Sequence, residues 1–512
     1  MSKKAEVTAT NSKTLWSVIT ASSVGTLIEW YDFYIFGSLA VILSEQFFPK
    51  TNPTAAFLST LATFAAGFIV RPFGALVFGR LGDIVGRKYT FLVTLILMGG
   101  STFAIGLIPN YETIGIAAPL LVLLLRLVQG LALGGEYGGA ATYVAEHSPA
   151  GKRGFFTSFI QTTATLGLFV SLGVILAVRE YIGVEAFNTW GWRVPFLLSA
   201  ILVGVSIFIR MRMNESPLFS KLKAEGKVSV NPIKESFGKK ENLKLVLLAL
   251  FGATAGQGVV WYTGQFYALS FLQKTCNIEF VQSSTIVAIA LLAATPFFIV
   301  FGWWSDRVGR KYIMMTGLLL AVVLYRPLYK QMYSLADLSK KIEIPELESL
   351  SRSTSFTEER DTVRVITESH RMSDKTELKV ITKETSAKDG VKKSEVKKEV
   401  VLNQKASIFI GLLVFVQVLL VTMVYGPIAA FLVELFPTRI RYTSMSLPYH
   451  IGNGIFGGLT PFIATALYES SKSESLPGGD PFAGLWYPII VAGVCFVIGV
   501  WLLPNKNKVI EE

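Results

Sequence analysis

The sequence predicts an all-α membrane protein with twelve transmembrane helices arranged in two six-helix halves. Three observations predict this fold: an apolar composition, a series of long apolar stretches, and a short charged motif that occurs twice. Of the 512 residues, 51% are hydrophobic and only 16% are charged, whereas about a quarter of a soluble chain is charged. The mean hydropathy is +0.50. Most of the chain therefore has the composition of a bilayer-embedded protein.

Each predicted helix is an apolar stretch long enough to cross a bilayer, which takes about 20 residues. The expected spans are 15–43, 55–79, 89–108, 115–144, 155–179, 193–211, 244–272, 282–304, 312–332, 406–433, 442–468 and 483–503. The first span carries Glu29 and Asp32 in its middle and has no small-residue cleavage site after a short apolar core. We therefore expect it to stay in the protein as the first helix.

A ten-residue motif, G-x-x-x-D-x-x-G-R-K, occurs at Gly79–Lys88 and again at Gly302–Lys311. Both copies follow an apolar span, which predicts two homologous halves. We interpret the motif as a gate: glycines allow close packing, the aspartate can bind a helix N-terminus or an arginine, and the basic pair stays at the surface. The predicted gate residues are Gly79, Asp83, Gly86, Arg87, Lys88, Gly302, Asp306, Gly309, Arg310 and Lys311.

A second repeat locates an insertion. Glu146-His147-Ser148-Pro149 follows helix 4, and Glu434-Leu435-Phe436-Pro437 follows helix 10. The first motif recurs after 223 residues and the second after 288, so about 65 extra residues lie between helices 8 and 10. The polar stretch 334–403 accounts for them. We expect a mobile charged loop there; the alternating segments 361–366 and 377–382 leave a small β hairpin as the alternative.

Basic residues set the predicted orientation. They gather in the N-terminal tail, in the 2–3, 4–5 and 8–9 junctions and in the 6–7 connector, so the positive-inside rule places both termini in the cytoplasm. The same residues explain the net charge of +12, and we expect no nucleic-acid partner. The expected units are a cytoplasmic tail (1–14), a six-helix half (15–211), a cytoplasmic connector (212–243), helices 7–9 (244–333), the extracytoplasmic insert (334–403), helices 10–12 (404–504) and a cytoplasmic tail (505–512).

Two carboxylates in the first span are candidates for proton coupling. An ionisable group near the middle of a span costs about 2.5–3.5 kcal/mol. Glu29 and Asp32 lie three residues apart and share a helix face. Each should disfavour ionisation of the other, which suits a proton carrier. A structural salt bridge to an arginine on a neighbouring helix is the alternative. Glu136, in the glycine-rich end of helix 4, is a third candidate.

Arg126, inside helix 4, is the best candidate for an anion ligand. A buried guanidinium needs a carboxylate, supplied by Glu29, by Asp32 or by an anionic solute. Purely structural pairing is the alternative. Arg71 lies nearer the cytoplasmic end of its span, so its long side chain can either face inward or extend to the surface.

The spans of the second half carry neutral polar and aromatic residues that suit a small polar solute. The candidate ligands on helices 7 and 11 are Gln257, Trp261, Tyr262, Gln265, Tyr267, Tyr449, His450 and Asn453. Membrane-interface belts also contain Tyr and Trp, and His450 either titrates near neutral pH or is a hydrogen-bonded core residue. We see no metal-ligand cluster, nucleophile–base set or P-loop, and expect neither an enzyme nor a cofactor.

These residues resemble a known family. The two gate motifs resemble those of the major facilitator superfamily. Within it, Glu29–Phe33, Arg126–Gly139, Glu146–Arg153 and Glu434–Tyr442 are similar to the metabolite:H⁺ symporter family. The resemblance covers nearly the whole chain apart from the insert. It implies a multi-pass protein of the bacterial inner membrane that imports acids or zwitterions such as α-ketoglutarate, citrate, shikimate, proline or betaine. Protons would accompany the solute by alternating access.

The chain departs from the family pattern in two places. The insert is not part of that pattern, and the tail 505–512 lacks the heptads of osmosensing members. Helix 5 also lacks the Gly-Pro signature of drug/proton antiporters between Gln161 and Gly173, which argues against efflux. A sensor or receptor with the transport fold, binding a partner through its external insert, is the second hypothesis. ATP-driven transport by this chain alone is disfavoured because no P-loop is present.

Overall fold

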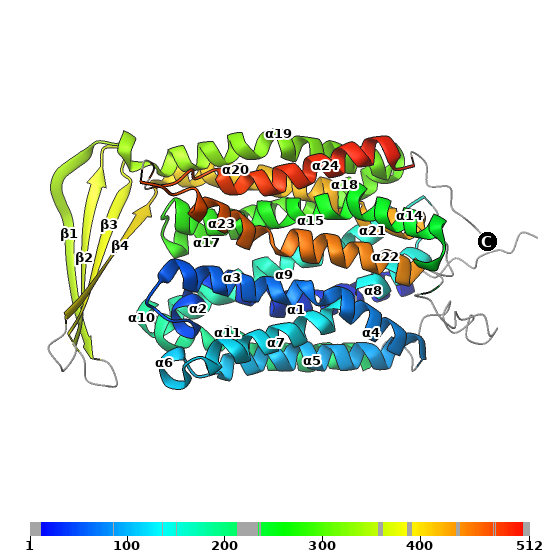
Figure 1. The fold of residues 1–512 in the computed structure, drawn as a ribbon, viewed down its shortest axis with the longest axis horizontal. Coiled ribbons are helices and arrows are strands. Elements are labelled where there is room, and N and C mark those ends of the chain that lie inside the picture. Colours follow the sequence, from blue (N-terminus) through cyan, green and yellow to red (C-terminus); the bar gives the residue numbers. More distant parts are fainter. Residues whose placement is uncertain are drawn as a thin grey trace, which may run out of the picture.

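The structure is a computed structural model. It describes residues 12–84, 87–135, 137–149, 151–211, 234, 237–356, 362–386, 392–436, 441–474, 476 and 478–504. Within these residues the chain forms a long helical body with a β-sheet at one end (Figure 1).

The N-terminal half contains the helices from α1 to α11. They are α1 (Ser12–Ser38), α2 (Ala40–Phe47), α3 (Pro53–Ile69), α4 (Arg71–Ile84), α5 (Arg87–Leu107), α6 (Tyr111–Ile114), α7 (Ala117–Gly134), α8 (Tyr137–His147), α9 (Arg153–Ile182), α10 (Val184–Ala186), the π-helix η1 (Phe187–Gly191) and α11 (Arg193–Met211). At the start of α3, the Asn52 side chain accepts a hydrogen bond from the Ala55 amide at 3.0 Å. Pro53 occupies the first helical position, where its missing N–H costs nothing.

The C-terminal half contains the remaining helices. They are α14 (Lys240–Ala249), η2 (Leu250–Thr254), α15 (Ala255–Tyr262), η3 (Thr263–Tyr267), α16 (Ala268–Ser270), η4 (Phe271–Thr275), α17 (Phe280–Ala294), α18 (Pro296–Val308), α19 (Arg310–Ala336), η5 (Leu338–Lys340), α20 (Gln404–Tyr425), α21 (Ile428–Leu435), α22 (Arg441–His450), η6 (Ile451–Gly457), α23 (Thr460–Ser470), η7 (Ala483–Leu485) and α24 (Trp486–Leu502). η2, η3, η4 and η6 are π-helical, a geometry that is frequent at functional sites.

The described helices form the predicted twelve-helix fold. Eight are long and apolar enough to cross a membrane, and ten are if each bent pair counts as one span. One of these pairs is α1 with α2, which meet at 63°. The other two expected spans, 89–108 and 442–468, correspond to α5 and to the interrupted series α22–η6–α23.

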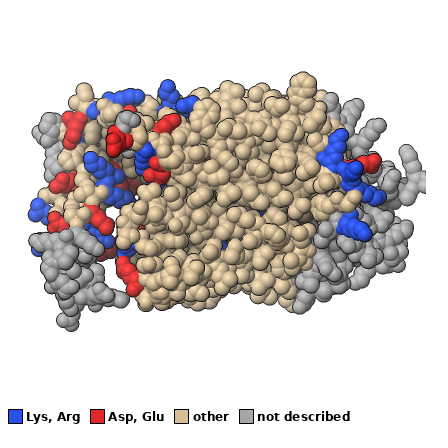
Figure 2. All heavy atoms as spheres, in the orientation of Figure 1, with Lys and Arg blue, Asp and Glu red and all other residues tan. Residues whose placement is uncertain are grey.

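The surface of the body is that of a membrane protein. In the face shown in Figure 2, charged side chains lie at the two ends, and a belt without them lies between. Large apolar side chains point outward from several spans, for example Phe73, Ile201, Ile289 and Val323, each more than half exposed. Lipid tails, and not water, are the environment that such a belt fits.

The two halves meet along a few helix pairs. α9 packs on α17, α18 and α21, while α4 and α8 pack on α22 and α3 packs on η6 and α23. Two glycines allow the closest approach: a Cβ on Gly302 of α18 would lie 2.6 Å from the carbonyl oxygen of Gly154 in α9. Either residue therefore has no room for a side chain while the halves are in this arrangement.

The insert is a β-sheet, and the expectation of a mobile loop is wrong. Four strands, β1 (Glu343–Phe356), β2 (Thr362–Met372), β3 (Glu377–Ser386) and β4 (Lys392–Val401), form an antiparallel meander in the order β1-β2-β3-β4. The two alternating segments of the hairpin alternative pair as β2 and β3, with Ile366 opposite Thr382. Cross-strand pairing along all four strands, interrupted only by register shifts between Glu343 and Ser349 of β1, compensates for the highly polar composition.

The sheet is attached to the helical body at β4. Val400 exchanges backbone hydrogen bonds with the α17-preceding loop, donating to Asn277 O at 2.7 Å and accepting from Glu279 N at 3.0 Å. The Gln282 side chain makes two further hydrogen bonds of 2.8 Å to the Leu402 backbone. We call the end of the body that carries the sheet the sheet end. The opposite end, where α18 meets α19, is the motif end.

Candidate functional site

Arg126 of α7 lies fully buried in the middle of the body. Its guanidinium donates to Gln129 Oε1 at 2.7 Å, to Phe33 O at 3.2 Å and to Phe64 O at 3.3 Å. It also lies 4.1 Å from the centroid of the Phe33 ring. Gln129 is held in turn by donating to Thr102 Oγ1 at 2.6 Å. These partners are neutral, so they orient the arginine without neutralising it.

Arg71 lies beside Arg126 and is 1% exposed, so a side chain that extends to the membrane surface is not what the structure contains. Its guanidinium carbon is 4.1 Å from the Phe68 ring centroid and 4.4 Å from that of Phe33. Glycine contacts hold α4 against α7 here, because a Cβ on Gly134 would collide with the Arg71 carbonyl. The first turn of α4 therefore directs Arg71 inward.

Neither arginine has an acidic partner in the described part of the chain. No ion pair joins Arg71 or Arg126 to a carboxylate there, and Nε and Nη2 of Arg71 and Nε of Arg126 lack hydrogen-bond acceptors. Buried polar groups are nearly always paired, and an unpaired buried guanidinium is especially costly. Two adjacent cations with free donors are therefore suited to receive an anion.

The C-terminal half presents aromatic rings to these arginines. Trp261 stacks on Tyr34 of α1 with centroids 5.1 Å apart, and Tyr262 meets Phe68 edge-on at 5.1 Å. Tyr449 stacks on Tyr137 at 3.5 Å. Each of these pairs joins one half to the other. We call Arg71, Arg126, Tyr34, Trp261, Tyr262 and Tyr449 the central site.

Further polar side chains of the C-terminal half surround the central site. The hydroxyls of Tyr425 and Tyr449 are 2.7 Å apart, and Asn453 donates to Tyr449 at 2.9 Å. Several buried polar atoms have no hydrogen-bond partner within the described residues. They belong to Gln257, Trp261, Tyr262, Gln265, His450 and Asn453. All six were predicted as solute ligands, and their free polar atoms suit that role.

The predicted ligand Tyr267 lies elsewhere. Its ring packs 5.6 Å from that of Tyr329, and it lines a pocket at the sheet end, although it is only two residues beyond Gln265. Gln265 itself accepts a long hydrogen bond of 3.4 Å from Thr165 of α9, across the contact between the halves. The structure therefore separates Tyr267 from the other candidate ligands.

The carboxylate of Asp32 is buried away from both arginines. Ser199 of α11 donates to its Oδ1 at 2.5 Å, while Oδ2 has no partner. No cation pairs with Asp32 among the described residues, so the structural salt bridge that was the alternative for this residue is not formed. Glu29 is buried as well, and Glu136 lies outside the described residues.

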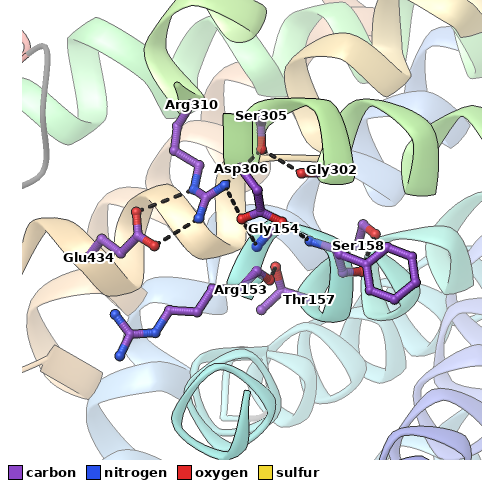
Figure 3. A network of polar contacts seen from close by, with 10 residues as sticks. Arg153, Gly154, Thr157, Ser158, Gly302, Ser305, Asp306, Arg310 and Glu434 are labelled. Carbon is purple, nitrogen blue, oxygen red and sulfur yellow. Dashed lines mark hydrogen bonds and ion pairs between the residues drawn. The ribbon is translucent and has the colours of Figure 1, made fainter. Parts of the chain in front are cut away.

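The second copy of the repeated motif forms an ion network at the motif end (Figure 3). Asp306 accepts hydrogen bonds from the Gly154 and Phe155 amides at the start of α9, both at 2.9 Å, and from Arg310 at 2.6 Å. Arg310 makes two hydrogen bonds to Glu434 of α21, at 2.9 and 3.3 Å. Asp306 thus binds a helix N-terminus and an arginine at once, where both the macrodipole and the free amides favour a carboxylate.

The other motif residues are described in part. Gly309 has a φ of 112°, which only glycine adopts readily, and this lets the chain turn from α18 into α19. Lys311 caps α24 by donating to Val500 O and Leu503 O at 2.9 and 2.7 Å. In the first copy, Gly86 and the side chains of Asp83, Arg87 and Lys88, with the surroundings of Gly79, lie outside the described residues.

Four residues of the site were missed or under-weighted in the sequence. They are Arg71, Tyr34, Tyr137 and Tyr425. The available signal for Arg71 was its place beside Pro72 and Gly74 within an apolar stretch. Tyrosines give no such signal, because they are common in membrane proteins and only the packing of the halves brings these together.

Comparison with known proteins agrees with this architecture. The family described as "Sugar (and other) transporter" matches residues 17–244. The chain is 29% identical to the proline/betaine transporter of Escherichia coli (98% of this chain, 86% of the relative). It is 33% identical to a putative metabolite transport protein of Haemophilus influenzae (97% and 96%) and 28% identical to the α-ketoglutarate permease of E. coli (96% and 94%).

The fold is shared with a solved transporter. The crystal structure of a D-xylose-proton symporter superposes with a TM-score of 0.65 at 17% identity, covering 96% of this chain and 99% of that one. The relatives are transport proteins and not enzymes, and none of those compared supports a sensor. The chain is therefore a multi-pass membrane transporter of the major facilitator superfamily and belongs, within it, to the metabolite:H⁺ symporter family.

Proposed function

We propose that this protein imports a small carboxylate-bearing metabolite together with protons, and that Arg71 and Arg126 bind the carboxylate. The observation that carries the proposal is the pair of buried guanidiniums with free donors and no acidic partner among the described residues. An incoming carboxylate would satisfy these donors, and tyrosines of the C-terminal half would close on it. The relatives named for proline, betaine and α-ketoglutarate support a solute of this class.

Asp32 is the proposed proton carrier. A carboxylate that is buried without a cation is costly to keep charged, which suits a group that takes up and releases a proton during each cycle. Its free Oδ2 leaves room for the proton. The proton gradient, with no cofactor, would then drive accumulation. We place the sheet end outside a bacterial inner membrane and both termini in the cytoplasm, because the basic connections gather at the motif end.

Reconstitution into proteoliposomes tests the solute. Uptake of α-ketoglutarate, citrate, shikimate, proline and glycine betaine would be measured with and without an imposed pH gradient. We expect one class of carboxylate to accumulate only with the gradient. Arg126→Gln should lower its uptake about 100-fold, because hydrogen bonds to charged groups are worth about 1.5–3 kcal/mol. Arg326→Gln, which changes an exposed arginine on α19, is the matched control.

Asp32→Asn tests the coupling separately. It should abolish gradient-driven accumulation and leave solute counterflow intact, because exchange without net transport needs no net proton movement. Gradient-driven accumulation that persists in Asp32→Asn would remove Asp32 from the mechanism. Uptake of every solute at full rate without a pH gradient or membrane potential would overturn symport itself.

A further inference from the structure

A second polar pocket lies at the sheet end, between the two halves. Its volume is about 140 Å³. Phe57 and Thr54 of α3 line it from the N-terminal half, while Tyr267 and Lys274 of the η3–η4 segment and Tyr468 of α23 line it from the C-terminal half. Both halves must therefore be in place for the pocket to exist.

Lys274 supplies a free cation to this pocket. Its ammonium lies 4.8 Å from the centroid of the Phe57 ring, and no acceptor or carboxylate among the described residues hydrogen-bonds or pairs with it. The other charged residues of the pocket neutralise each other, since Lys472 and Glu469 pair at 2.6 Å. Glu45 of α2, Lys397 of β4 and Glu469 itself act on Lys274 only through longer-range electrostatics. The pocket therefore keeps an ammonium with three donors for a ligand.

Residues of α3 and of the α15–η3 series connect the pocket to the central site. Along α3, Phe57 lines the pocket, Phe64 follows two turns deeper, and Phe68 contacts Tyr262 of the central site. Phe57 and Phe68 are eleven residues apart, about 16 Å along a helix. Between them, Phe64 meets Phe266 of η3 with ring centroids 5.3 Å apart. The Phe64–Phe266 contact thus lies between the pocket and the central site, where Phe266 in turn packs on Tyr262 with centroids 5.8 Å apart.

We propose that this pocket is an outer binding site for the carboxylate of the transported solute, with Lys274 as its anion ligand. The solute would bind there first and reach Arg71 and Arg126 when Phe64 and Phe266 move apart. The inference rests on the proposed function in two respects, that the solute carries a carboxylate and that the sheet end faces outward. The position of the outer site, its cation Lys274 and its separation from the central site are features of the pocket in the structure.

The kinetic test compares the two directions of transport. In right-side-out proteoliposomes, uptake is measured against the external concentration of α-ketoglutarate or of proline, whichever the unaltered protein transports, and efflux against the internal concentration. Lys274→Met should raise the KM of uptake about 3- to 10-fold at low ionic strength, the loss expected for one partly solvated charged hydrogen bond. The kcat of uptake and the KM of efflux should not change, so the kcat of efflux should fall by the same factor, because a substitution cannot change the ratio of kcat/KM between the two directions. Lys274→Arg should restore uptake. Lys50→Met, at an exposed lysine paired with Glu112, is the control.

A chemical test measures solute binding in the pocket without relying on transport. Ser270→Cys places a thiol in the pocket, and the native Cys276 and Cys495 are buried. In a protein that also carries Arg126→Gln, the same solute should still slow thiosulfonate modification of Cys at position 270, and adding Lys274→Met should remove that protection. Three outcomes would each overturn the outer site. They are an unchanged KM of uptake in Lys274→Met, an equal rise in the KM of efflux, and protection of the thiol that survives Lys274→Met. Failure of the central proposal is distinct, because it would appear as normal transport in Arg126→Gln.

Discussion

The two ends of the contact between the halves are built from different chemistry. At the motif end, Asp306 binds the first amides of α9 and Arg310, and Gly154 lies against Gly302 with no room for a side chain. At the sheet end, the cross-half contacts include cations over rings, Lys274 on Phe57 and Arg179 on Phe280, beside an open pocket. Hydrogen-bonded ions need a defined geometry, whereas a cation can slide over a ring face.

The two ends of the contact between the halves are therefore held closed in different ways. The hydrogen-bonded ion pairs at the motif end are either made or broken. The cation–ring contacts at the sheet end weaken gradually as the halves separate. Alternating access requires the two ends to open in turn. The motif end should therefore dominate the free-energy difference between the states, and substitutions at the two ends should shift the balance by different amounts.

Replacing Asp306 should have the largest effect. Asp306→Ala removes the hydrogen bonds to α9 and leaves Arg310 without one of its carboxylates, and breaking a buried ion pair costs about 3–5 kcal/mol. The protein should shift to a state open at the motif end. Pulsed electron paramagnetic resonance would show this as a longer distance between spin labels at Met211→Cys and Tyr312→Cys, which are exposed positions on α11 and α19. Asp337→Ala, at the sheet end, is the control; an unchanged distance distribution would contradict the assignment.

Replacing Glu434 should have a smaller effect in the same direction. Glu434→Gln keeps the shape and weakens the two hydrogen bonds from Arg310, and a hydrogen bond to a charged group is worth about 1.5–3 kcal/mol. Asp306 and its bonds to α9 stay intact, so the same pair of labels should report a partial opening. An opening as large as that of Asp306→Ala would show that Glu434, and not the α9 contact, holds this end.

Replacing Arg179 tests the sheet end and should have a weak effect. Arg179→Gln removes the cation from the Phe280 ring, a contact of about 0.5–1 kcal/mol at such sites. Labels at Tyr181→Cys and Ile342→Cys, both highly exposed at this end, should show at most a modest lengthening. A shift that matches Asp306→Ala would remove the asymmetry between the two ends.

The attachment of the sheet should have the smallest and most local effect, and it should depend on pH. Burial alone would raise the pKa of Asp374, but the ion pair with Lys341 at 2.9 Å and hydrogen bonds from Thr376 outweigh it and lower the pKa below 3.8. A lowered folded pKa stabilises the attachment above the unfolded value and loses that contribution as the pH falls through the folded value. A spin label at Lys375→Cys should therefore become more mobile only below about pH 4. Asp374→Asn should make its mobility independent of pH.

The sequence predicted the spans and the contacts of Asp306 well because both depend on local information. A span is a property of about 20 consecutive residues, and the repeated motif places an aspartate beside a helix junction. The inward turn of Arg71 was not predictable in this way, since it depends on glycine contacts between α4 and α7. The sheet was under-predicted for a related reason: pairing of four polar strands is a non-local property.

The candidate ligands also differ in how far local sequence predicts them. Arg126 was singled out because a charge within an apolar stretch is conspicuous from sequence alone. Tyr267 belongs to the same helical series as Gln265, yet it faces a different pocket. Sequence spacing gives the side of a helix, and the π-helical turns of η3 alter that spacing. The roles of the candidate residues in solute and proton binding stay predictions, which the experiments above test.

The sheet enters and leaves the transporter at nearly the same point. Lys341, before β1, and Asn403, after β4, both hydrogen-bond Thr376 in the β2–β3 turn. A module whose two joints are neighbours can be gained or lost in a single genetic event without altering the path of the flanking helices. The insert can therefore evolve at its own pace, as an exchangeable module at the sheet end of a body constrained by alternating access. Excising it and joining α19 to α20 by a short turn should give a compact transporter that still folds.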